Sequence, residues 1–452
     1  MATEYLTETV FTWGAPPLKF GIGALDEIGY DCGNLGLSRI LIVTDQGVAA
    51  TGVPARAAEA MRTAGLKPEI FSGAHVEPTD ASFRAAAEFA ADTDWDGFVA
   101  IGGGSSIDTA KAINLLTTSG GDLMDYVNQP IGGGKAPTAP LKPLIAVPTT
   151  AGTGAESTAV CIMDLLALRV KSGISHPMLR PVLAVVDPLT TITVPPRVTA
   201  SCGLDVLCHA LESYTARDYR AYPRRQAAER AVYVGSNPVS DAFIEKALPL
   251  LGQSFRRAVL TGHDLQARSD MLLAASFAGM GFGNAGVHIP HACAYPIAGQ
   301  VKAYRPPDYP QDEAMIPHGE SVSLTAPAAF RFTFPADPER HLRAASLLDP
   351  SGASTRSDFG LGAGSGSGAG ADSGSGSGSG ANDDRERLPR AIVALMRDIG
   401  TPSGIGAVGY TESDIPELVA GTLKQQRLLS MAPRDVSGEN LTAVFRDSIA
   451  NW

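Results

Sequence analysis

The segment GLDVLCHALE, residues 203–212, places a carboxylate and an imidazole four residues apart. If this segment is helical, Asp205 and His209 lie one turn apart on the same face. The residues around them are apolar, whereas an ordinary amphipathic helix would turn two polar groups toward water. Burying both groups without a partner would be costly, so the pattern indicates that a divalent cation holds them in the interior.

Two later segments contain the histidines that could complete such a site: His288 and His291 in GNAGVHIPHACAYP, and His318 in MIPHGES. One aspartate and three histidines are a complete set of protein ligands for a divalent first-row metal. Because His288 and His291 are three residues apart, one is expected to bind the metal and the other to support a ligand or carry a proton. The opposing interpretation is that His318 is a turn residue and that the D-x-x-x-H pair is accidental. The remaining histidines are expected at the surface: His75, His176, His263 and His341.

Two glycine-containing loops could bind a dinucleotide. GGGSSID, residues 102–108, follows an apolar strand and opens a helical run, so its glycines would admit an anion close to free N–H groups at a helix N-terminus. PTTAGTGAES, residues 148–157, also follows a strand and adds threonine hydroxyls. A tight strand-to-helix turn would explain the first loop alone, but the two loops together favour a dinucleotide over a mononucleotide.

Asp45 and Lys171 are two further expected cofactor contacts. Asp45 ends an apolar strand, where a carboxylate suits the 2′-OH of a ribose and repels a 2′-phosphate, which favours NAD over NADP. The alternative for Asp45 is a helix N-cap. Lys171 lies in VKSGIS, and its alternative is an exposed, solvated lysine.

The elements that position these residues fall into two groups. Short apolar runs at 39–45, 97–104, 144–150 and 182–188 alternate with helical patterns, which predicts a parallel sheet with both faces covered. After the Pro-Pro pair at 195–196 the pattern is helical. The predicted fold is therefore an α/β Rossmann-like N-terminal domain that binds the dinucleotide, over residues 1–195, and an all-α C-terminal domain that binds the metal, over residues 196–452. Within the second domain, the Gly/Ser-rich stretch 360–381 is expected to be a flexible insertion.

Composition and charge exclude some classes of partner. The chain of 452 residues has a net charge of −11, which argues against a nucleic-acid partner. No apolar run has the ~18 residues of a membrane helix, so no membrane partner is expected. The N-terminus carries no Lys or Arg before Lys19 and resembles neither a signal nor a transit peptide, and the five cysteines form no CxxC motif. These features predict a cytoplasmic protein with reduced thiols, with a mitochondrial location as the less favoured alternative.

Five strings in order carry a resemblance to a known family: GGGSSIDTAKA, PTTAGTGAE, GLDVLCHALESY, HACAYPIAG and IPHGE. Together they resemble the iron-containing (group III) alcohol dehydrogenases, from about Thr9 to the C-terminus except in the insertion. The stretches VEPTDASFRAAAEFA, GSNPVSD, FAGMGFGNAGVHIPH and GYTESDIPELVAGTLKQQRLL are similar to the hydroxyacid–oxoacid transhydrogenase branch of that family.

The resemblance implies a role for each matched residue. The metal ligands would be Asp205, His209, His291 and His318. The pyrophosphate loop would be Gly102, Gly103, Gly104 and Ser105, with Asp108 at its end, and the second cofactor loop would use Thr149, Thr150 and Thr153. Asp45 would bind the ribose of NAD. The family name implies Fe2+, although the same ligands suit Zn2+, and dimers are common in the family, so a homodimer or larger homo-oligomer is expected.

The sequence departs from the usual family pattern at two places. Many members carry a histidine four residues after the third ligand, where this chain has Tyr295. The expected proton relay is therefore His288 or Tyr295, with a supporting role for His288 as the alternative. The insert QVKAYRPPDYPQDEAM lengthens the spacing between His291 and His318. Lys302 and Arg305 in this insert are expected to bind a substrate carboxylate, and the alternative is a solvated basic loop.

The resemblance implies hydride transfer from 4-hydroxybutyrate to 2-oxoglutarate through bound NAD. Two other functions use the same scaffold. A plain NAD-dependent alcohol dehydrogenase would release NADH on a small alcohol. A metal- and NAD-using lyase similar to the dehydroquinate synthases is less favoured, because those enzymes lack the PTTAGTGAE and GLDVLCHALE strings. A metal-binding protein without catalytic activity would not need both cofactor loops.

Overall fold

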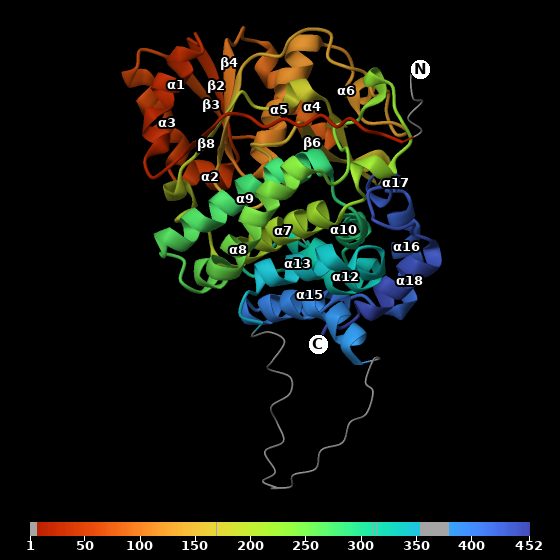
Figure 1. The fold of residues 1–452 in the computed structure, drawn as a ribbon. Helices are drawn as coiled ribbons and strands as arrows, with labels where there is room; N and C mark the ends of the chain where they lie inside the picture. Colours follow the sequence, from red (N-terminus) through yellow and green to blue (C-terminus); the bar gives the residue numbers. More distant parts are fainter. Residues whose placement is uncertain (1–6, 169, 310, 313, 353–378) are drawn as a thin grey trace, which may run out of the picture.

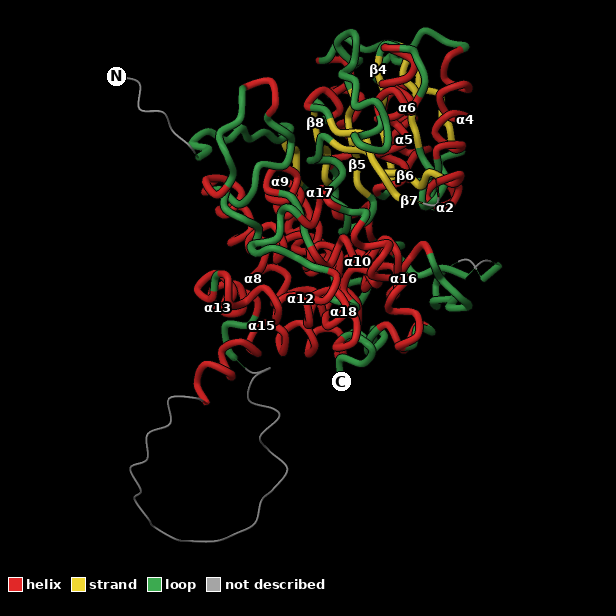
Figure 2. Tube along the Cα trace, turned by 90° about the vertical axis from the view of Figure 1, so that its right-hand side faces the viewer, coloured by secondary structure: helices red, strands yellow, loops and turns green. Residues whose placement is uncertain are grey.

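The computed structural model describes residues 7–168, 170–309, 311–312, 314–352 and 379–452. The two halves of the chain form two layers, with the α/β half above the helical half in Figure 1. Figure 2 shows the strands gathered in the upper half and helices filling the lower one. This arrangement confirms the predicted α/β plus all-α fold.

The upper layer is built on a six-stranded sheet in which every pairing is parallel. Its strand order is β1-β8-β5-β4-β2-β3. The strands are β1 (Leu18–Phe20), β2 (Arg39–Val43), β3 (Lys67–Phe71), β4 (Gly97–Gly102), β5 (Leu144–Pro148) and β8 (Leu183–Val186). The four central strands match the four predicted apolar runs. The two edge strands were not predicted, because β1 is short and β3 carries Lys and Glu in place of a continuous apolar run.

Helices cover both faces of the sheet, which is why its inner strands are continuously apolar. Ile40 and Ile42 pack on the side of α1 (Ile28–Asn34) and α3 (Val53–Thr63). Leu41 and Val43 point the other way. They pack toward α4 (Asp80–Ala91) and α5 (Gly104–Ser119). The short helices α2 (Gln46–Ala50) and α6 (Leu123–Tyr126) complete this layer.

The chain order of the strands creates a topological switch point at the carboxyl edge of the sheet. From β2 the chain runs outward to β3, then returns to β4 on the opposite side of β2. Connections therefore leave the neighbouring strands β2 and β4 in opposite directions, and ligands of open α/β sheets bind at such a point. Asp45 follows β2 and Gly103 follows β4, so the fold brings both predicted cofactor segments to this edge of the sheet.

A two-stranded antiparallel sheet, which the apolar patterns of the sequence do not predict, joins the two layers. It consists of β6 (Val160–Leu165) and β7 (Val170–Ser175). The buried Lys111 of α5 fastens it, because its Nζ donates to the carbonyls of Ala155 and Val160 at 2.8 and 2.7 Å. This hairpin positions Lys171 beside the second layer.

The lower layer contains no strand among its described residues. Its central helices are α7 (Pro196–Thr215), α8 (Pro238–Leu260) and α9 (Leu265–Ala285), and α7 is buried over almost all of its length. Around them lie α10 (Ile289–Gly299), α11 (His318–Ser323), α12 (Ala326–Thr333), α13 (Pro338–Leu348), α15 (Ser379–Asp398), α16 (Ile415–Leu423), α17 (Gln426–Leu429) and α18 (Gly438–Asp447). No single helix among the described residues has the length and apolarity to cross a membrane. Only α9 and α10 taken together meet these two criteria, and the pair is sharply bent.

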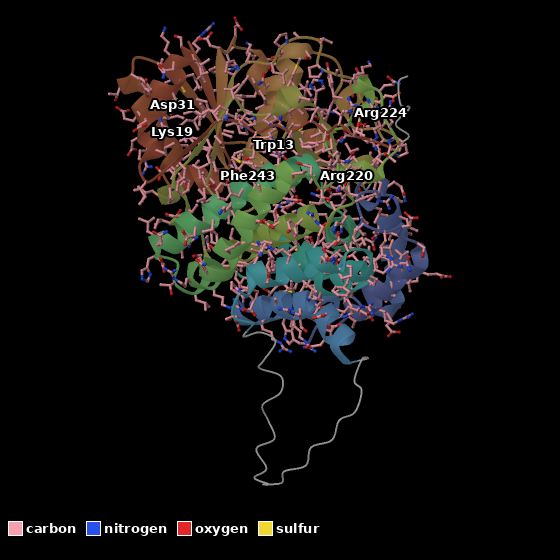
Figure 3. The ribbon with its side chains drawn as sticks, viewed as in Figure 1. Trp13, Lys19, Asp31, Arg220, Arg224 and Phe243 are labelled. Carbon is pink, nitrogen blue, oxygen red and sulfur yellow. The ribbon has the colours of Figure 1, made fainter. Side chains whose placement is uncertain are left out.

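The N-terminal segment before β1 packs against helices of the lower layer. The ring of Trp13 stacks on that of Phe243 with centroids 5.3 Å apart (Figure 3). The backbone N–H of Gly14 donates to Asn284 Oδ1 at 3.0 Å. Glu8 forms an ion pair with Arg230 at 3.3 Å. This segment therefore ties the two layers together, although it precedes the α/β core in sequence.

Two sequence expectations differ from the structure in the lower layer. Most of the 360–381 insertion lies outside the described residues, but α15 already begins at Ser379, so the end of that stretch is helical. His341 was expected at the surface and is buried. Its Nδ1 lies 2.7 Å from the carbonyl oxygen of Asp337 and its Nε2 2.8 Å from Thr333 Oγ1. The polar neighbours of His341 in sequence concealed that it lies on the inner face of α13.

Candidate active site

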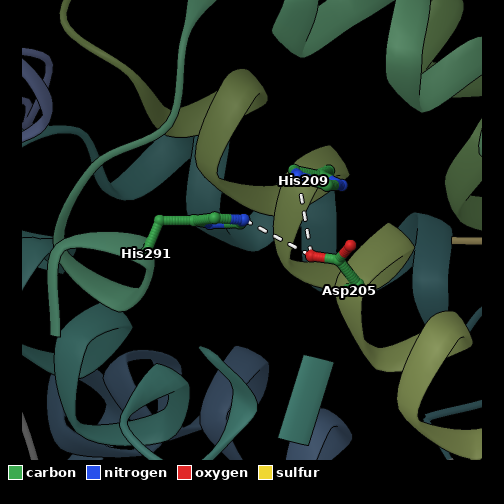
Figure 4. A group of neighbouring side chains, drawn as sticks. All are labelled: Asp205, His209 and His291. Carbon is green, nitrogen blue, oxygen red and sulfur yellow. Dashed lines mark ion pairs between the residues drawn. The ribbon is translucent and has the colours of Figure 1, made fainter. Parts of the chain in front are cut away.

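The four predicted metal ligands converge from three helices. α7 supplies Asp205 and His209, α10 supplies His291, and α11 begins at His318. Each histidine directs its Nε2 toward Asp205 Oδ1. The distances are 3.5 Å for His209, 3.4 Å for His291 and 3.7 Å for His318. Figure 4 shows the two side chains of α7 and the ring of His291 pointing toward one another. The inward orientation of Asp205 and His209 thus has a physical cause, since both face a common point.

The donor atoms fit a divalent metal ion. Asp205 Oδ1 and His291 Nε2 are buried and have no hydrogen-bond partner. Buried polar atoms in native structures are nearly always paired, so two unpaired atoms facing each other indicate a missing partner. Ligand atoms of Asp205, His209 and His291 all lie within 4.8 Å of one another. One carboxylate oxygen and three imidazole nitrogens are a donor set that suits first-row metals.

Glu212 is not among the residues predicted from the sequence, but it supports the ligand His291. Its Oε1 lies 2.6 Å from His291 Nδ1, and its Oε2 accepts the backbone N–H of His288 at 2.6 Å. A carboxylate at Nδ1 holds the proton there and leaves Nε2 free for a metal. A signal was present in the sequence, because positions 205, 209 and 212 share one face of a helix.

Electrostatics tie metal binding to proton release. Burial lowers the pKa of His291, but Glu212 and Asp205 outweigh it and raise that pKa to about 9. Burial raises the pKa of Asp205, but the histidines, His209 foremost, bring it below its ordinary value. His291 therefore carries a proton near neutral pH in the metal-free protein, and a metal must displace it.

A glycine allows α11 to approach α7. A Cβ at Gly319 would lie 1.8 Å from the carbonyl oxygen of Ser201, which is part of the α7 backbone. A side chain at this position would push α11 away and move His318 from Asp205. The glycine of the IPHGE string is thus a packing requirement of the metal cluster.

The structure does not support His288 as the proton relay. The ring is buried and does not line the pocket that contains the ligands. Its Nδ1 accepts the backbone N–H of Ile289 at 2.8 Å, and its Nε2 lies 3.1 Å from Thr215 Oγ1. His288 instead caps α10, and its backbone N–H donates to Glu212. These contacts agree with the alternative stated for His288, a role in supporting the metal ligands.

The two predicted cofactor loops meet at the N-terminus of α5. A Cβ at Gly104 would lie 2.7 Å from Thr153 Cγ2, and one at Gly103 would lie 3.3 Å from Thr150 Oγ1. Thr149 joins the loops through its backbone N–H, which donates to Gly102 O at 3.0 Å. The threonine side chains of the second loop thus pack on the glycines of the first and form a cradle beside the free N–H groups of a sixteen-residue helix, which suits an anion such as pyrophosphate.

Asp45 lies at the edge of this cradle and caps a helix. Its Oδ1 accepts the backbone N–H of Val48 at 2.9 Å, so the N-cap alternative describes part of its role. Its Oδ2 accepts from Ser106 Oγ of the first loop at 3.0 Å. The cap and this contact fix the carboxylate beside the glycine loop. A contact between Asp45 and a ribose stays a prediction.

A pocket that opens to solvent joins the cradle to the metal ligands. Predicted site residues lining it are Gly104, Ser105, Asp108, Thr153, Lys171, Asp205, His209, His291, Tyr295 and His318. Residues that were not predicted include Glu77, Tyr233, Phe282 and Arg427. A molecule in this pocket can therefore touch the cofactor loops and the metal cluster together.

Lys171 and Asp108 are held by protein groups within the pocket. Lys171 Nζ pairs with Glu77 at 2.7 Å and Asp164 at 3.1 Å, so it is not a solvated lysine. Asp108 is buried, and its Oδ2 accepts the backbone N–H of Ile162 at 2.9 Å. Both residues attach the β6–β7 hairpin to the rest of the site.

Tyr295 lies where a proton relay would be useful. It lines the pocket, and its ring centroid is 6.4 Å from that of His318. Burial raises the pKa of Tyr295 to about 12, so its hydroxyl keeps its proton near neutral pH.

The structure does not bring Lys302 and Arg305 to the pocket. Lys302 pairs with Asp414 at 2.6 Å, and Arg305 donates to the carbonyl of Gln311 at 3.1 Å. Both belong to an exposed loop, as the alternative held. Besides Lys171, a second basic residue lines the pocket: Arg427 of α17, which lies more than a hundred residues further along the chain than Lys302 and Arg305.

Comparison with known proteins agrees with this geometry. Residues 16–188 match the model of the iron-containing alcohol dehydrogenases, and residues 225–360 match that of the C-terminal domain of the same family. The chain is 43% identical to the mitochondrial hydroxyacid-oxoacid transhydrogenase of Bos taurus, covering 98% of this chain and 91% of the relative. It is 42% identical to that of Homo sapiens, covering 98% and 90%.

Solved structures share the whole fold. A 1,3-propanediol oxidoreductase superposes with a TM-score of 0.79 at 30% identity, covering 97% of this chain and 100% of that one. A sulfoacetaldehyde reductase from Bifidobacterium kashiwanohense, solved in complex with NAD+, superposes with a TM-score of 0.75 at 26% identity, covering 97% and 98%.

The same relatives correct the predicted location. Those of Bos taurus and Homo sapiens are both named mitochondrial, which contradicts the cytoplasmic location expected from the acidic N-terminus. A short stretch without basic residues does not establish a compartment. The family matches, the identity over nearly the full length and the converging Asp–His ligands lead to one conclusion: the chain belongs to the iron-containing alcohol dehydrogenase family.

Proposed function

We propose that this chain is a hydroxyacid–oxoacid transhydrogenase that moves a hydride from 4-hydroxybutyrate to 2-oxoglutarate. The products are succinate semialdehyde and 2-hydroxyglutarate. The observation that carries the proposal is the single pocket shared by the metal ligands and the cofactor loops, through Asp205, His291, Gly104 and Thr153. The names of the 43%-identical relatives supply the class of the two substrates.

NAD is the proposed hydride carrier. When bound, NAD would supply the hydride-accepting and hydride-donating chemistry between C4 of the donor and C2 of the acceptor, so no other oxidant or reductant would be consumed. The cradle of Gly103, Gly104 and Thr153 supports pyrophosphate binding. The fixed carboxylate of Asp45 supports NAD over NADP, because it would repel a 2′-phosphate.

Asp205, His209, His291 and His318 would hold the metal ion, which we propose to be Fe2+ from the family match, with Zn2+ as the alternative. When bound, such an ion supplies Lewis-acid stabilisation of a substrate oxygen. Glu212 keeps the proton on His291 Nδ1. The ring of Phe282 stacks on that of His209, with the two centroids 3.8 Å apart, and so covers one face of this ligand.

Proton movement is assigned to Tyr295. The donor hydroxyl loses a proton when its C4–H bond breaks, and the acceptor oxygen gains one in the second half-reaction, so the cycle has no net proton change. Tyr295 Oη keeps its own proton at neutral pH and can pass one on by donating and accepting at the same atom.

The test is an assay without added NAD. Purified metal-loaded protein is mixed with 4-hydroxybutyrate and 2-oxoglutarate, and the products are measured. We expect 2-hydroxyglutarate and succinate semialdehyde in equal amounts without free NADH. Formation of NADH only after NAD is added, with no 2-hydroxyglutarate before, would contradict the proposal.

A plain NAD-dependent alcohol dehydrogenase is the second function considered. The 30% identity to a 1,3-propanediol oxidoreductase favours it, because that protein has the same fold over its full length. Such an enzyme would oxidise a small diol with added NAD at least as efficiently as it oxidises 4-hydroxybutyrate.

A further inference from the structure

The pocket contains two cationic side chains apart from its histidines, and they differ in their partners. Lys171 is balanced by two carboxylates, Glu77 and Asp164. Arg427 also lines the pocket, but no carboxylate of the described residues pairs with it. A half-buried guanidinium without a counter-ion is a site where an anionic ligand gains a strong partner.

Neutral groups hold Arg427 in place. Its Nη1 donates to Ser175 Oγ at 3.3 Å, and its Cζ lies 4.9 Å from the ring centroid of Tyr233. Ser175 Oγ is itself fixed, because it accepts from Asn128 Nδ2 at 3.1 Å. A guanidinium has five N–H donors, so these contacts orient it and leave donors for a ligand. The positive charge is therefore positioned but not neutralised.

We infer that Arg427 binds the substrate carboxylate that is distal to the reacting carbon, in both half-reactions. The inference rests on the proposed function, since it takes hydroxy- and oxoacids as the substrates. It gives the carboxylate-binding role to α17 in place of the exposed loop with Lys302 and Arg305. Arg427 is a specificity-determining residue in this account, because it touches the substrate away from the transferred hydride.

The chemistry of the two substrates explains how one cation serves both. In 4-hydroxybutyrate the carboxylate carbon lies three bonds from the carbon that bears the hydroxyl. In 2-oxoglutarate the C5 carboxylate lies three bonds from the oxo carbon C2. With the oxygen of the reacting carbon at the metal cluster, both distal carboxylates fall at the same distance from it. A fixed guanidinium in the lining of the pocket therefore recognises the feature that donor and acceptor share.

The test compares R427Q and R427K with K424Q in protein loaded with metal and NAD. Lys424 is exposed, lies on the same segment and does not line the pocket, so K424Q is the matched control. The binding probe is glutarate, which has both carboxylates but nothing to oxidise or reduce, and its dissociation constant is measured by calorimetry. We expect R427Q to weaken glutarate binding about 10- to 100-fold, with a smaller loss in R427K, because a charge-assisted bidentate contact is removed. K424Q should bind as the unmodified protein does.

Kinetics separate recognition from a general defect. With added NAD, kcat/KM of R427Q for 4-hydroxybutyrate should fall about 10- to 100-fold, whereas that for 1-butanol, which lacks the carboxylate, should change less than about threefold. Equal losses on both substrates, unchanged glutarate binding, or no glutarate binding by the unmodified protein would each overturn the inference. If glutarate binds through Arg427 but no 2-hydroxyglutarate forms without added NAD, the carboxylate site stands and the transhydrogenase function fails.

Discussion

At the scale of single residues, the metal cluster depends on the side of His291 that faces away from Asp205. The Nδ1 atom of His291 lies 2.6 Å from Glu212, while its Nε2 lies 3.4 Å from Asp205 Oδ1. The carboxylates of Glu212 and Asp205 therefore contact opposite edges of the His291 ring. Only Nε2 is free to bind a metal, because Glu212 requires the proton to stay on Nδ1.

Glu212→Gln is expected to weaken metal affinity by about 10- to 100-fold. The amide can still accept the backbone N–H of His288, but its NH2 group would donate to His291 Nδ1 and move the ring proton to Nε2. Metal content after dialysis against a graded series of chelator concentrations measures the loss. Glu156→Gln is the control, since Glu156 is also buried but accepts from Ser276 outside the ligand set. Equal metal retention in both variants would show that Glu212 does not orient the ligand.

The expected preference for NAD over NADP also depends on a single residue, Asp45. Asp45→Ser keeps an oxygen that can cap α2 at Val48 but removes the negative charge beside the glycine loop. The ratio of kcat/KM for NADP to that for NAD should rise about 10-fold, because one unfavourable charge contact with a 2′-phosphate is worth roughly 1.4 kcal/mol. An unchanged ratio would remove Asp45 from the ribose site.

At the scale of elements, the ligands are brought together by the close approach of α11 to α7. Gly319→Ala should lower the free energy of unfolding by about 2 kcal/mol or more and weaken metal binding, because its Cβ would collide with Ser201 O. The control is Gly33→Ala, where a Cβ meets nothing within 4 Å and stability should change by less than about 1 kcal/mol. Urea unfolding with and without metal measures both effects. Identical behaviour of the two variants would contradict the packing argument.

The parts of the site that could be predicted are those formed by residues close together in the sequence. The helical spacing of Asp205 and His209 and the two loops after apolar strands follow from local patterns, and their geometry agrees with the structure. Arg427 and the β6–β7 hairpin could not be predicted, because their importance comes from the approach of segments distant in the chain. Lys302 shows the converse, since a basic residue close to the ligands in sequence lies on an exposed loop.

At the scale of the whole molecule, the pocket lies between two layers, so the contacts that join the layers matter for function. The N-terminal segment is one such contact, through the ion pair of Glu8 and through Trp13, which Figure 3 labels. The Arg230 guanidinium lowers the pKa of Glu8 to about 2, against the opposing effect of burial. Since this pKa is lowered on folding, the ionised carboxylate stabilises the folded state above the ordinary pKa near 4.5, and the stabilisation is lost as the pH falls toward 2.

Glu8→Gln should therefore be less stable than the unmodified protein at pH 7, by about 1–2 kcal/mol. The difference should shrink as the pH falls below 4.5, where the carboxylate of the unfolded chain begins to take up a proton. Urea unfolding of both proteins across this range, followed by tryptophan fluorescence, gives the two curves. Parallel curves at every pH would mean that Glu8 does not anchor the segment in its ionised form.

The central claim is that one pocket receives the hydride from the donor, holds it on bound NAD and returns it to the acceptor. Isotopic transfer measures this directly: 4-hydroxybutyrate with deuterium at C4 is incubated with the metal-loaded protein, 2-oxoglutarate and an excess of unlabelled free NADH. We expect deuterium at C2 of the 2-hydroxyglutarate, undiluted by the free cofactor. Product that carries only protium, with deuterium accumulating in the free cofactor pool, would contradict it.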